Sequence, residues 1–209
     1  MGSAFRHARV RYAVNRPIVI GVTGGIATGK SSVLALLARR GADTIDADTV
    51  YHEMIGPGGP LVAAIVERFG PDVRAEDGSI DRRALAGIVF ADRAALADLD
   101  QITHPAVIQE VQARIEASDA QVVAVDAIKL IESGMADECD SVCLVVCDPA
   151  IQRERLMRRN ALTSDEADLR LAAQPNEAAR RQRADVVIDN SGTPDDLARQ
   201  VDRHWQLVK

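Results

Sequence analysis

The sequence predicts an α/β fold, with a parallel sheet core of five strands flanked by helices. Five short apolar runs, separated by segments with helical patterns, support this prediction. Strands of a parallel sheet are buried on both faces, so they consist of continuous apolar residues rather than alternating ones. The predicted strands are residues 18–22, 44–45, 122–125, 142–146 and 186–188.

Start signals mark several of the helices between these strands. Asp148-Pro149 provides an N-cap followed by a proline in the first turn, and Thr163 with Glu166 forms a capping box. The predicted helices cover residues 32–40, 104–118 and 151–159, and two more begin after Thr163 and Thr193. The last helix carries an apolar stripe that we expect to be buried, at Leu197, Val201, Trp205 and Val208.

The segment between the second and third strands, residues 47–120, is too long for a single crossover helix. It must therefore hold an inserted helical region. In open α/β sheets, ligands bind beyond the carboxyl ends of the strands. We expect the insertion to lie there and to hold a second substrate.

The chain has 209 residues and a formal net charge of −6. This length suits one α/β core with inserted segments. The acidic balance argues against a nucleic-acid partner, and no apolar run approaches the ~20 residues that cross a bilayer. We expect a cytoplasmic protein with no nucleic-acid or membrane partner, either a monomer or a weak homo-oligomer. Residues 1–16 are basic and are predicted to be a flexible N-terminal tail.

Three cysteines, Cys139, Cys143 and Cys147, are spaced four residues apart. On a helix this spacing would place them on one face and would suggest a metal site. The apolar run before Asp148 indicates a strand instead, in which residues four apart are separated by about 13 Å. Buried thiols are therefore the favoured interpretation.

A glycine-rich motif follows the first predicted strand and precedes the helix over residues 32–40. The pattern G-x-x-x-x-G-K-[ST] is supplied by Gly24, Gly29, Lys30 and Ser31. Its glycines let backbone N–H groups face phosphate oxygens, its lysine reaches the β and γ phosphates, and its hydroxyl binds Mg²⁺. The motif in this context predicts a P-loop NTPase-type fold and a nucleoside triphosphate site.

Carboxylates follow the second and third strands. Asp46 and Asp48 lie where a hydroxyl acceptor would bind, so one of them is a candidate to orient the hydroxyl or take its proton. Asp126 has the position of a Walker-B acid near Mg²⁺. Helix capping and strand-end capping are the alternative roles for these aspartates.

The helix after the fourth strand is rich in arginine. Arg155 and Arg159 are four residues apart and share one face, and guanidinium groups pair bidentately with phosphate. A solvated helix surface is the alternative. The chain has no Asn-Lys-x-Asp guanine-binding motif, which argues against a GTPase and favours a small-molecule kinase.

Beyond the glycine-rich motif, the residues resemble the dephospho-CoA kinase family over nearly the whole chain after residue 16. The matching segments are Ile20 to Ile26, Ile45-Asp46-Ala47-Asp48, Gly58-Gly59-Pro60, Asp77 to Leu85, Ile102-Thr103-His104-Pro105, Arg155 to Arg159, Ala172-Ala173-Gln174, Ala184-Asp185 and Asp189 to Gly192. The resemblance implies phosphoryl transfer from ATP, with Mg²⁺, to the 3′-hydroxyl of dephospho-CoA, the last step of coenzyme A biosynthesis.

The resemblance also implies roles for individual residues. Asp48 would be the catalytic residue that activates the acceptor, with Lys30 and Arg159 as the other catalytic residues. Ser31 and Asp126 would hold the metal, and Asp46, Arg82, Arg83 and His104 would join Asp48 in binding the acceptor. ATP would be bound by Gly25, Ile26, Ala27, Thr28, Gly29, Lys30, Ser31, Ser32, Arg155 and Asn190, the last of these near the adenine.

By the same resemblance, residues 17–46, 111–154 and 183–209 would form the nucleotide-binding core. Residues 47–110 would bind the acceptor, and residues 155–182 would form a lid. Two departures stand out, Ile128-Lys129 in place of the family's Pro-Leu and Ala27 in place of a P-loop glycine. The alternative functions are another small-molecule or nucleotide kinase of the same fold, and a nucleotide-dependent binding module without transfer.

Overall fold

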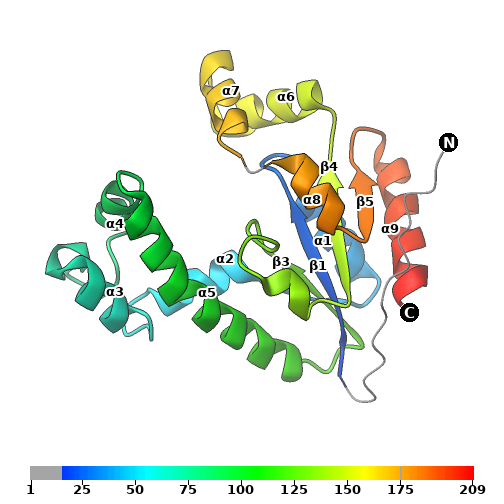
Figure 1. Cartoon of the computed structure of the whole chain (residues 1–209). Helices are drawn as coiled ribbons and strands as arrows, with labels where there is room; N and C mark the ends of the chain where they lie inside the picture. The colour runs from blue at the N-terminus through cyan, green and yellow to red at the C-terminus, as the bar shows by residue number, and fades with distance from the viewer. Residues whose placement is uncertain (1–15, 175) are drawn as a thin grey trace. The chain divides into compact units, whose positions relative to one another are not determined.

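The protein contains a five-stranded parallel sheet with the strand order β2-β3-β1-β4-β5. Figure 1 labels β3, β1, β4 and β5 of this sheet. The computed structural model describes residues 16–174 and 176–209, so most of the predicted tail, residues 1–15, lies outside the described residues. All five predicted strands are present. They are β1 (Ile18–Gly24), β2 (Asp43–Asp46), β3 (Val122–Asp126), β4 (Ser141–Val146) and β5 (Val186–Asp189).

The register of the central strands aligns the residues that follow them. Val22 of β1 lies opposite Asp126 of β3, and Gly24 of β1 lies opposite Val145 of β4. Parallel strands end at the same edge of a sheet. The glycine-rich loop after β1 and the acidic end of β3 therefore share one edge.

Helices α1 (Lys30–Arg39) and α9 (Pro194–Val208) pack against each other and against the sheet. Their contact belongs to a core in which Val33 and Leu37 of α1 meet Val201 and Trp205 of α9. The apolar stripe of the last helix is buried, as expected. Helix α1 follows the loop after β1 in the chain, so this packing holds the start of the helix at the end of that loop.

Three more helices belong to the same compact unit, which comprises Ser118–Lys209 and the described residues up to Ile45. These helices are α6 (Pro149–Asn160), α7 (Ser164–Ala172) and α8 (Glu177–Arg183). Helix α6 follows β4 and packs on α7, while α8 lies along β4 (Figure 1). The predicted capping box at Thr163 and Glu166 is confirmed.

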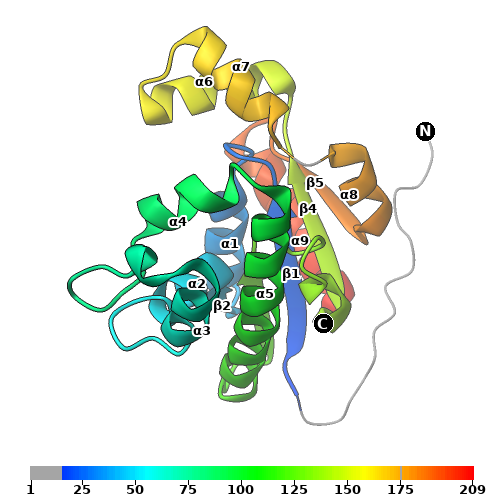
Figure 2. The same cartoon turned by 60° about the vertical axis from the view of Figure 1, so that its left-hand side comes forward.

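The second compact unit, Asp46–Ala117, is helical. It contains α2 (Ala47–Met54), α3 (Val62–Phe69), a 3-10 turn (Pro71–Val73), α4 (Arg82–Val89) and α5 (Arg93–Glu116). Helices α2, α3 and α4 all contact α5 (Figure 2). The inserted helical region expected between the second and third strands is therefore present.

Helix α5 corrects one predicted boundary. We expected a helix over residues 104–118, but α5 begins at Arg93, where Asp92 accepts the N–H of Ala94 at 2.8 Å. Pro105 lies inside the helix and removes only one backbone donor. Tertiary packing compensates, because one residue in four is buried along the whole helix, at Ala95, Leu99, Thr103, Val107, Val111 and Ile115.

Two of the three cysteines, Cys143 and Cys147, are buried in the core. Cys143 lies in β4 and is buried, as is Cys147, whereas Cys139 precedes the strand and is partly buried. Burial raises the pKa of the Cys139 and Cys143 thiols to about 12.

Within residues 16–174 and 176–209, no group of three or more potential ligands could hold a metal ion. In the same ranges, no helix combines the length and the apolar character needed to cross a membrane.

Candidate active site

The glycine-rich loop lies between β1, which ends at Gly24, and α1, which begins at Lys30. This strand–loop–helix context is the one that the motif requires. Thr28 is buried, and its hydroxyl donates to the carbonyl of Gly25 at 2.9 Å. The loop is thus closed by an internal hydrogen bond, and the carbonyl of its last residue, Gly29, accepts the N–H groups of Ser32 and Val33 in the first turn of α1 at 3.0 and 3.4 Å. The N-terminal end of a helix is a favourable place for a phosphate group.

Two residues of the loop have left-handed backbone conformations. Gly29 has a φ of 94°, and Ala27 has a φ of 60°. For Gly29 this conformation has no steric cost, whereas an L-residue such as Ala27 pays about 1–2 kcal/mol in this region. The departure from the family's glycine noted in the sequence therefore falls at a strained position.

Lys30 and Asp126 meet at the edge of the sheet. The ammonium of Lys30 lies 3.9 Å from a carboxylate oxygen of Asp126, and both side chains are mostly buried. Ser31 is the next residue of α1 and is exposed. A carboxylate and a hydroxyl beside a phosphate loop are oxygen ligands of the kind that Mg²⁺ prefers. These residues fit the metal role predicted for them.

Arg155 of α6 extends toward the glycine-rich loop. Its Nη2 donates to the backbone carbonyl of Asn190 at 3.1 Å. Its Nη1 lies 3.9 Å from the position that a Cβ on Gly29 would take, and it is buried with no hydrogen-bond partner among the described residues. A buried guanidinium donor without a partner is costly. An anion held by the loop would satisfy it.

Arg159 does not share this environment, although it is one turn away from Arg155. It is exposed, and its Nε donates to the side chain of Asn160 at 3.1 Å. Arg158, beside it, is exposed and pairs with Glu154 at 3.7 Å. Of the arginine cluster predicted for this helix, the structure thus brings only Arg155 to the loop.

Asn190 follows β5 and is buried. Its side-chain Nδ2 donates to the backbone carbonyl of Thr28 at 2.8 Å. A Cβ on Gly29 would collide with this same nitrogen. The structure therefore places the side chain of Asn190 against the backbone of the phosphate loop, a contact that the sequence did not predict.

Asp46 and Asp48 lie at the start of α2, in the second unit. Asp46 is its N-cap and accepts the N–H groups of Asp48 and Thr49 at 2.9 and 3.1 Å. The capping alternative is therefore confirmed for Asp46. Asp48 lies in the first turn of the helix, with its side chain exposed.

Other predicted acceptor residues lie in the second unit as well. His104 pairs with Asp100 at 3.2 Å, one turn earlier on α5. Burial raises the pKa of the nearby Tyr51 hydroxyl, while the charge of Arg82 lowers it and that of Asp100 raises it. These charge effects and the His104–Asp100 pair link Tyr51, Arg82, Asp100 and His104 electrostatically, and we call these four residues the polar cluster. Sequence reasoning missed Tyr51 and Asp100.

Arg83 lies beside this cluster's Arg82 in the first turn of α4. Asp81 caps that turn by accepting the N–H groups of Arg83 and Ala84 at 2.9 and 3.1 Å. The side chains of Arg82 and Arg83 are both exposed. The capped helix start fixes the backbone from which the two arginines project.

Two glutamines that touch the phosphate loop were also missed. Gln152 donates to the carbonyl of Ile26 at 2.7 Å, and the N–H of Ile26 donates to Gln174 at 2.6 Å. Gln174 lies in one of the segments that match the family, whereas nothing distinguishes Gln152 in the sequence from any polar helix residue. Both contacts lie within the first unit.

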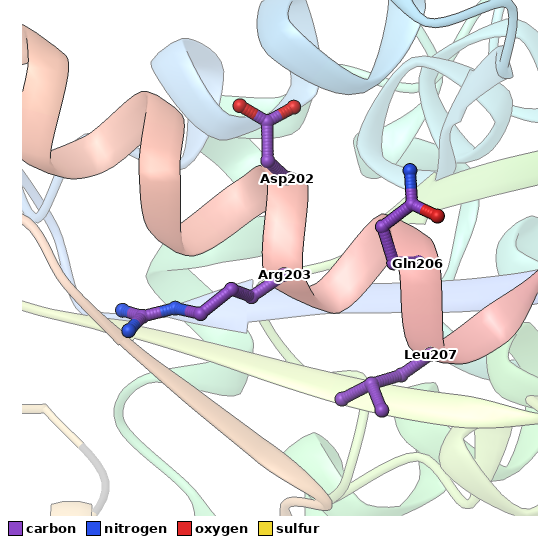
Figure 3. Close-up of a pocket in the computed structure, with 4 residues that line it drawn as sticks. All are labelled: Asp202, Arg203, Gln206 and Leu207. Carbon is purple, nitrogen blue, oxygen red and sulfur yellow. The ribbon is translucent and has the colours of Figure 1, made fainter.

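A surface pocket on α9 contains none of the predicted site residues. It is lined by Asp202, Arg203, Gln206 and Leu207, all from one helix (Figure 3). Asp202 and Gln206 extend to one side, while Arg203 and Leu207 extend to another. Because these side chains do not converge, the pocket lacks the arrangement of a binding site.

Comparison with known proteins identifies the family. The sequence model of dephospho-CoA kinase matches residues 18–196. A dephospho-CoA kinase of Anaeromyxobacter dehalogenans is 46% identical over 188 residues, covering 88% of this chain and 89% of the relative. A dephospho-CoA kinase of Geobacter sulfurreducens is 43% identical over 190 residues, covering 90% of this chain and 96% of the relative.

Solved structures agree in fold. A crystal structure of a Thermus thermophilus protein superimposes with a TM-score of 0.80 at 30% identity, covering 93% of this chain and all of the other. A dephospho-CoA kinase from Campylobacter jejuni gives a TM-score of 0.66 at 24% identity, covering 90% of this chain and 95% of the other. The family match spans well over half of the chain, and the relatives are matched over most of their length. This chain belongs to the dephospho-CoA kinase family.

Proposed function

We propose that the protein transfers the γ-phosphoryl group of ATP to the 3′-hydroxyl of dephospho-CoA, giving coenzyme A and ADP. The observation that carries the ATP side of this proposal is the unpartnered Nη1 of Arg155 beside Gly29. Together with the start of α1 and the ammonium of Lys30, it surrounds the loop with donors suited to phosphate. Family membership supports the choice of acceptor.

In this proposal the residues of the first unit bind and orient the donor. Backbone N–H groups of the segment from Gly25 to Ser32 hold the phosphates, except those of Ile26, Thr28 and Ser32, which donate to Gln174, Gly25 and Gly29. Lys30 and Arg155 neutralise the charge of the phosphates. Ser31 and Asp126 would hold Mg²⁺, which supplies further positive charge to the phosphate oxygens. Asn190 keeps the loop in shape through its bond to the carbonyl of Thr28.

The residues of the second unit provide for the acceptor. Asp48 orients the 3′-hydroxyl and accepts its proton, so that the oxygen can attack the γ-phosphorus as the bond to the β-phosphate oxygen breaks. The polar cluster around Tyr51, with Arg82 and His104, would contact the acceptor, together with Asp46 and Arg83. We assign residues 47–110 to acceptor binding.

We assign residues 155–182 as a lid over the nucleotide, with residues 17–46, 111–154 and 183–209 as the core. Closure would bring Arg159, exposed in this structure, to the transferring phosphoryl group. It would also exclude water, which would otherwise hydrolyse ATP. We further propose that the protein works in the cytoplasm as a monomer or a weak homo-oligomer. The net charge of −6 argues against a nucleic-acid partner.

ADP release tests the proposal. The protein should release ADP rapidly with dephospho-CoA and Mg²⁺, and much more slowly with nucleoside monophosphates or shikimate. Asp48→Asn should lower kcat by at least about 100-fold while leaving ATP binding intact, because only the proton acceptor is lost. Asp195→Asn, on the exposed start of α9, is the matched control. ATP hydrolysis at one rate with every acceptor would contradict the proposal.

A further inference from the structure

Both backbone polar groups of Ile26, in the middle of the phosphate-binding loop, are bonded to glutamine side chains. The carbonyl of Ile26 accepts from Nε2 of Gln152 at 2.7 Å. The N–H of Ile26 donates to Oε1 of Gln174 at 2.6 Å. A single loop residue is thus held from both sides by two carboxamides.

The direction of each bond is determined by the backbone. A carbonyl can only accept and an N–H can only donate, so Gln152 must present its NH₂ group and Gln174 its oxygen. A further bond, from Nε2 of Gln174 to the carbonyl of Leu171 at 3.4 Å, agrees with this orientation. The two glutamines are therefore not interchangeable, although they have the same side chain.

Gly25 makes the close approach of both carboxamides possible. A Cβ at this position would lie 2.6 Å from Oε1 of Gln174 and 2.9 Å from Nε2 of Gln152. Such distances are too short for non-bonded atoms. The glycine beside Ile26 thus serves the contact with the glutamines, in addition to any contact with phosphate.

The two glutamines come from one continuous segment that lies apart from the loop in sequence. Gln152 is on α6, and Gln174 follows Ala173, the C-cap of α7. Helices α6 and α7 pack on each other. Arg155, which faces Gly29, is also on α6. The orientation of the loop backbone is therefore linked to the position of the arginine.

We propose that Gln152 and Gln174 are positioning residues for the ATP site. They fix the backbone of Ile26 in one orientation and couple the α6–α7 segment to the phosphate-binding loop. This inference rests on the proposed use of the loop to bind ATP. It adds that the binding-competent form of the loop depends on one donated and one accepted side-chain hydrogen bond.

Two charge-matched substitutions test this directly. Q152E and Q174E each add one negative charge next to Ile26, so charge alone predicts equal effects. A carboxylate can replace Gln174 as an acceptor, but it cannot replace Gln152 as a donor and instead faces the Ile26 carbonyl. The Kd for ATP, measured by calorimetry, and the KM for ATP should rise at least about fivefold more in Q152E than in Q174E.

Further variants separate positioning from folding. Q174L removes the acceptor without adding charge, and Q152L removes the donor in the same way, so both should raise the KM for ATP about tenfold while leaving the KM for dephospho-CoA unchanged. These two variants carry the test if Q152E does not fold. Q206E, an equal charge change on the exposed side of α9, is the control and should match the wild type.

The outcomes distinguish this inference from the function on which it rests. A wild-type protein that fails to bind ATP would overturn the proposed function itself. Tight ATP binding by the wild type, with Q152E and Q174E alike within about twofold, would leave the function standing and refute the positioning role. Equal losses for ATP and dephospho-CoA in Q152L and Q174L would also refute it, because they would indicate a general structural effect.

Discussion

Acid should destabilise this protein through His204, a buried histidine of α9. The side chain is 2% exposed, and its Nε2 lies 2.9 Å from the hydroxyl of Ser141 in β4. Its Nδ1 is buried with no hydrogen-bond partner among the described residues. Burial lowers the pKa of His204 from 6.5 to about 4, and the charge of Asp185 offsets this only in part. The folded protein therefore holds this histidine neutral.

The lowered pKa determines the sign and size of the effect. Below pH 6.5 the unfolded chain binds a proton at this histidine that the folded protein does not, so the free energy of unfolding falls as the pH falls. The contribution of His204 to the free energy of unfolding is complete above pH 6.5 and is lost progressively as the pH falls to about 4. At about 1.4 kcal/mol per pKa unit, the total loss is about 3 kcal/mol, of which about 2 kcal/mol is lost by pH 5.

Urea unfolding at a series of pH values measures this loss. His204→Gln keeps a polar group near Ser141 but has no titrating ring, so its free energy of unfolding should vary about 2 kcal/mol less between pH 7.5 and pH 5. His52, which is exposed on α2, provides the control substitution His52→Gln, which should keep the wild-type pH dependence. An identical pH dependence in the wild type and His204→Gln would refute the reasoning.

Three further predictions concern the phosphate loop and the ion pair that the buried Arg180 forms with Glu132. Ala27→Gly removes the left-handed strain at a φ of 60° and should raise the free energy of unfolding by up to about 1 kcal/mol, seen as a higher urea midpoint. Gly29→Ala should lower the free energy of unfolding by at least about 2 kcal/mol and weaken ATP binding, because the new Cβ would collide with the side chain of Asn190. An unchanged affinity for ATP would contradict this contact. Glu132→Gln leaves the buried guanidinium of Arg180, 2.8 Å away, without its carboxylate and should cost about 2 kcal/mol. Adding Arg180→Met should recover part of that loss, and strict additivity of the two changes would count against a coupled pair.

Much of the fold was predictable because its signals are local. Strands β1, β3, β4 and β5 each contain a continuous apolar run, and the capping box at Thr163 lies within four residues. Helix α5 shows the limit of such reasoning. Pro105 breaks the local pattern, yet the buried residues on either side keep the helix continuous, because burial along its length outweighs one lost backbone hydrogen bond.

The candidate site also has features that the sequence predicted and features that it did not. The loop from Gly24 to Ser31 was predictable because the spacing of its glycines, lysine and serine identifies the residues of the tight turn and the side chains that contact phosphate. The different environments of Arg155 and Arg159 were not, because a helical spacing of four places both on one face without saying what that face meets.

By itself, the sequence determined the α/β class, the phosphate loop with its lysine and the family to which the chain belongs. Only the tertiary structure decided what holds that loop. Gln152 and Gln174 reach Ile26 across 126 and 148 residues, and Asn190 reaches Thr28 across 162. The physical reason is that a carboxamide has no periodicity and no charge to reveal its partner. Its role depends on which backbone groups the folded chain places within hydrogen-bonding distance.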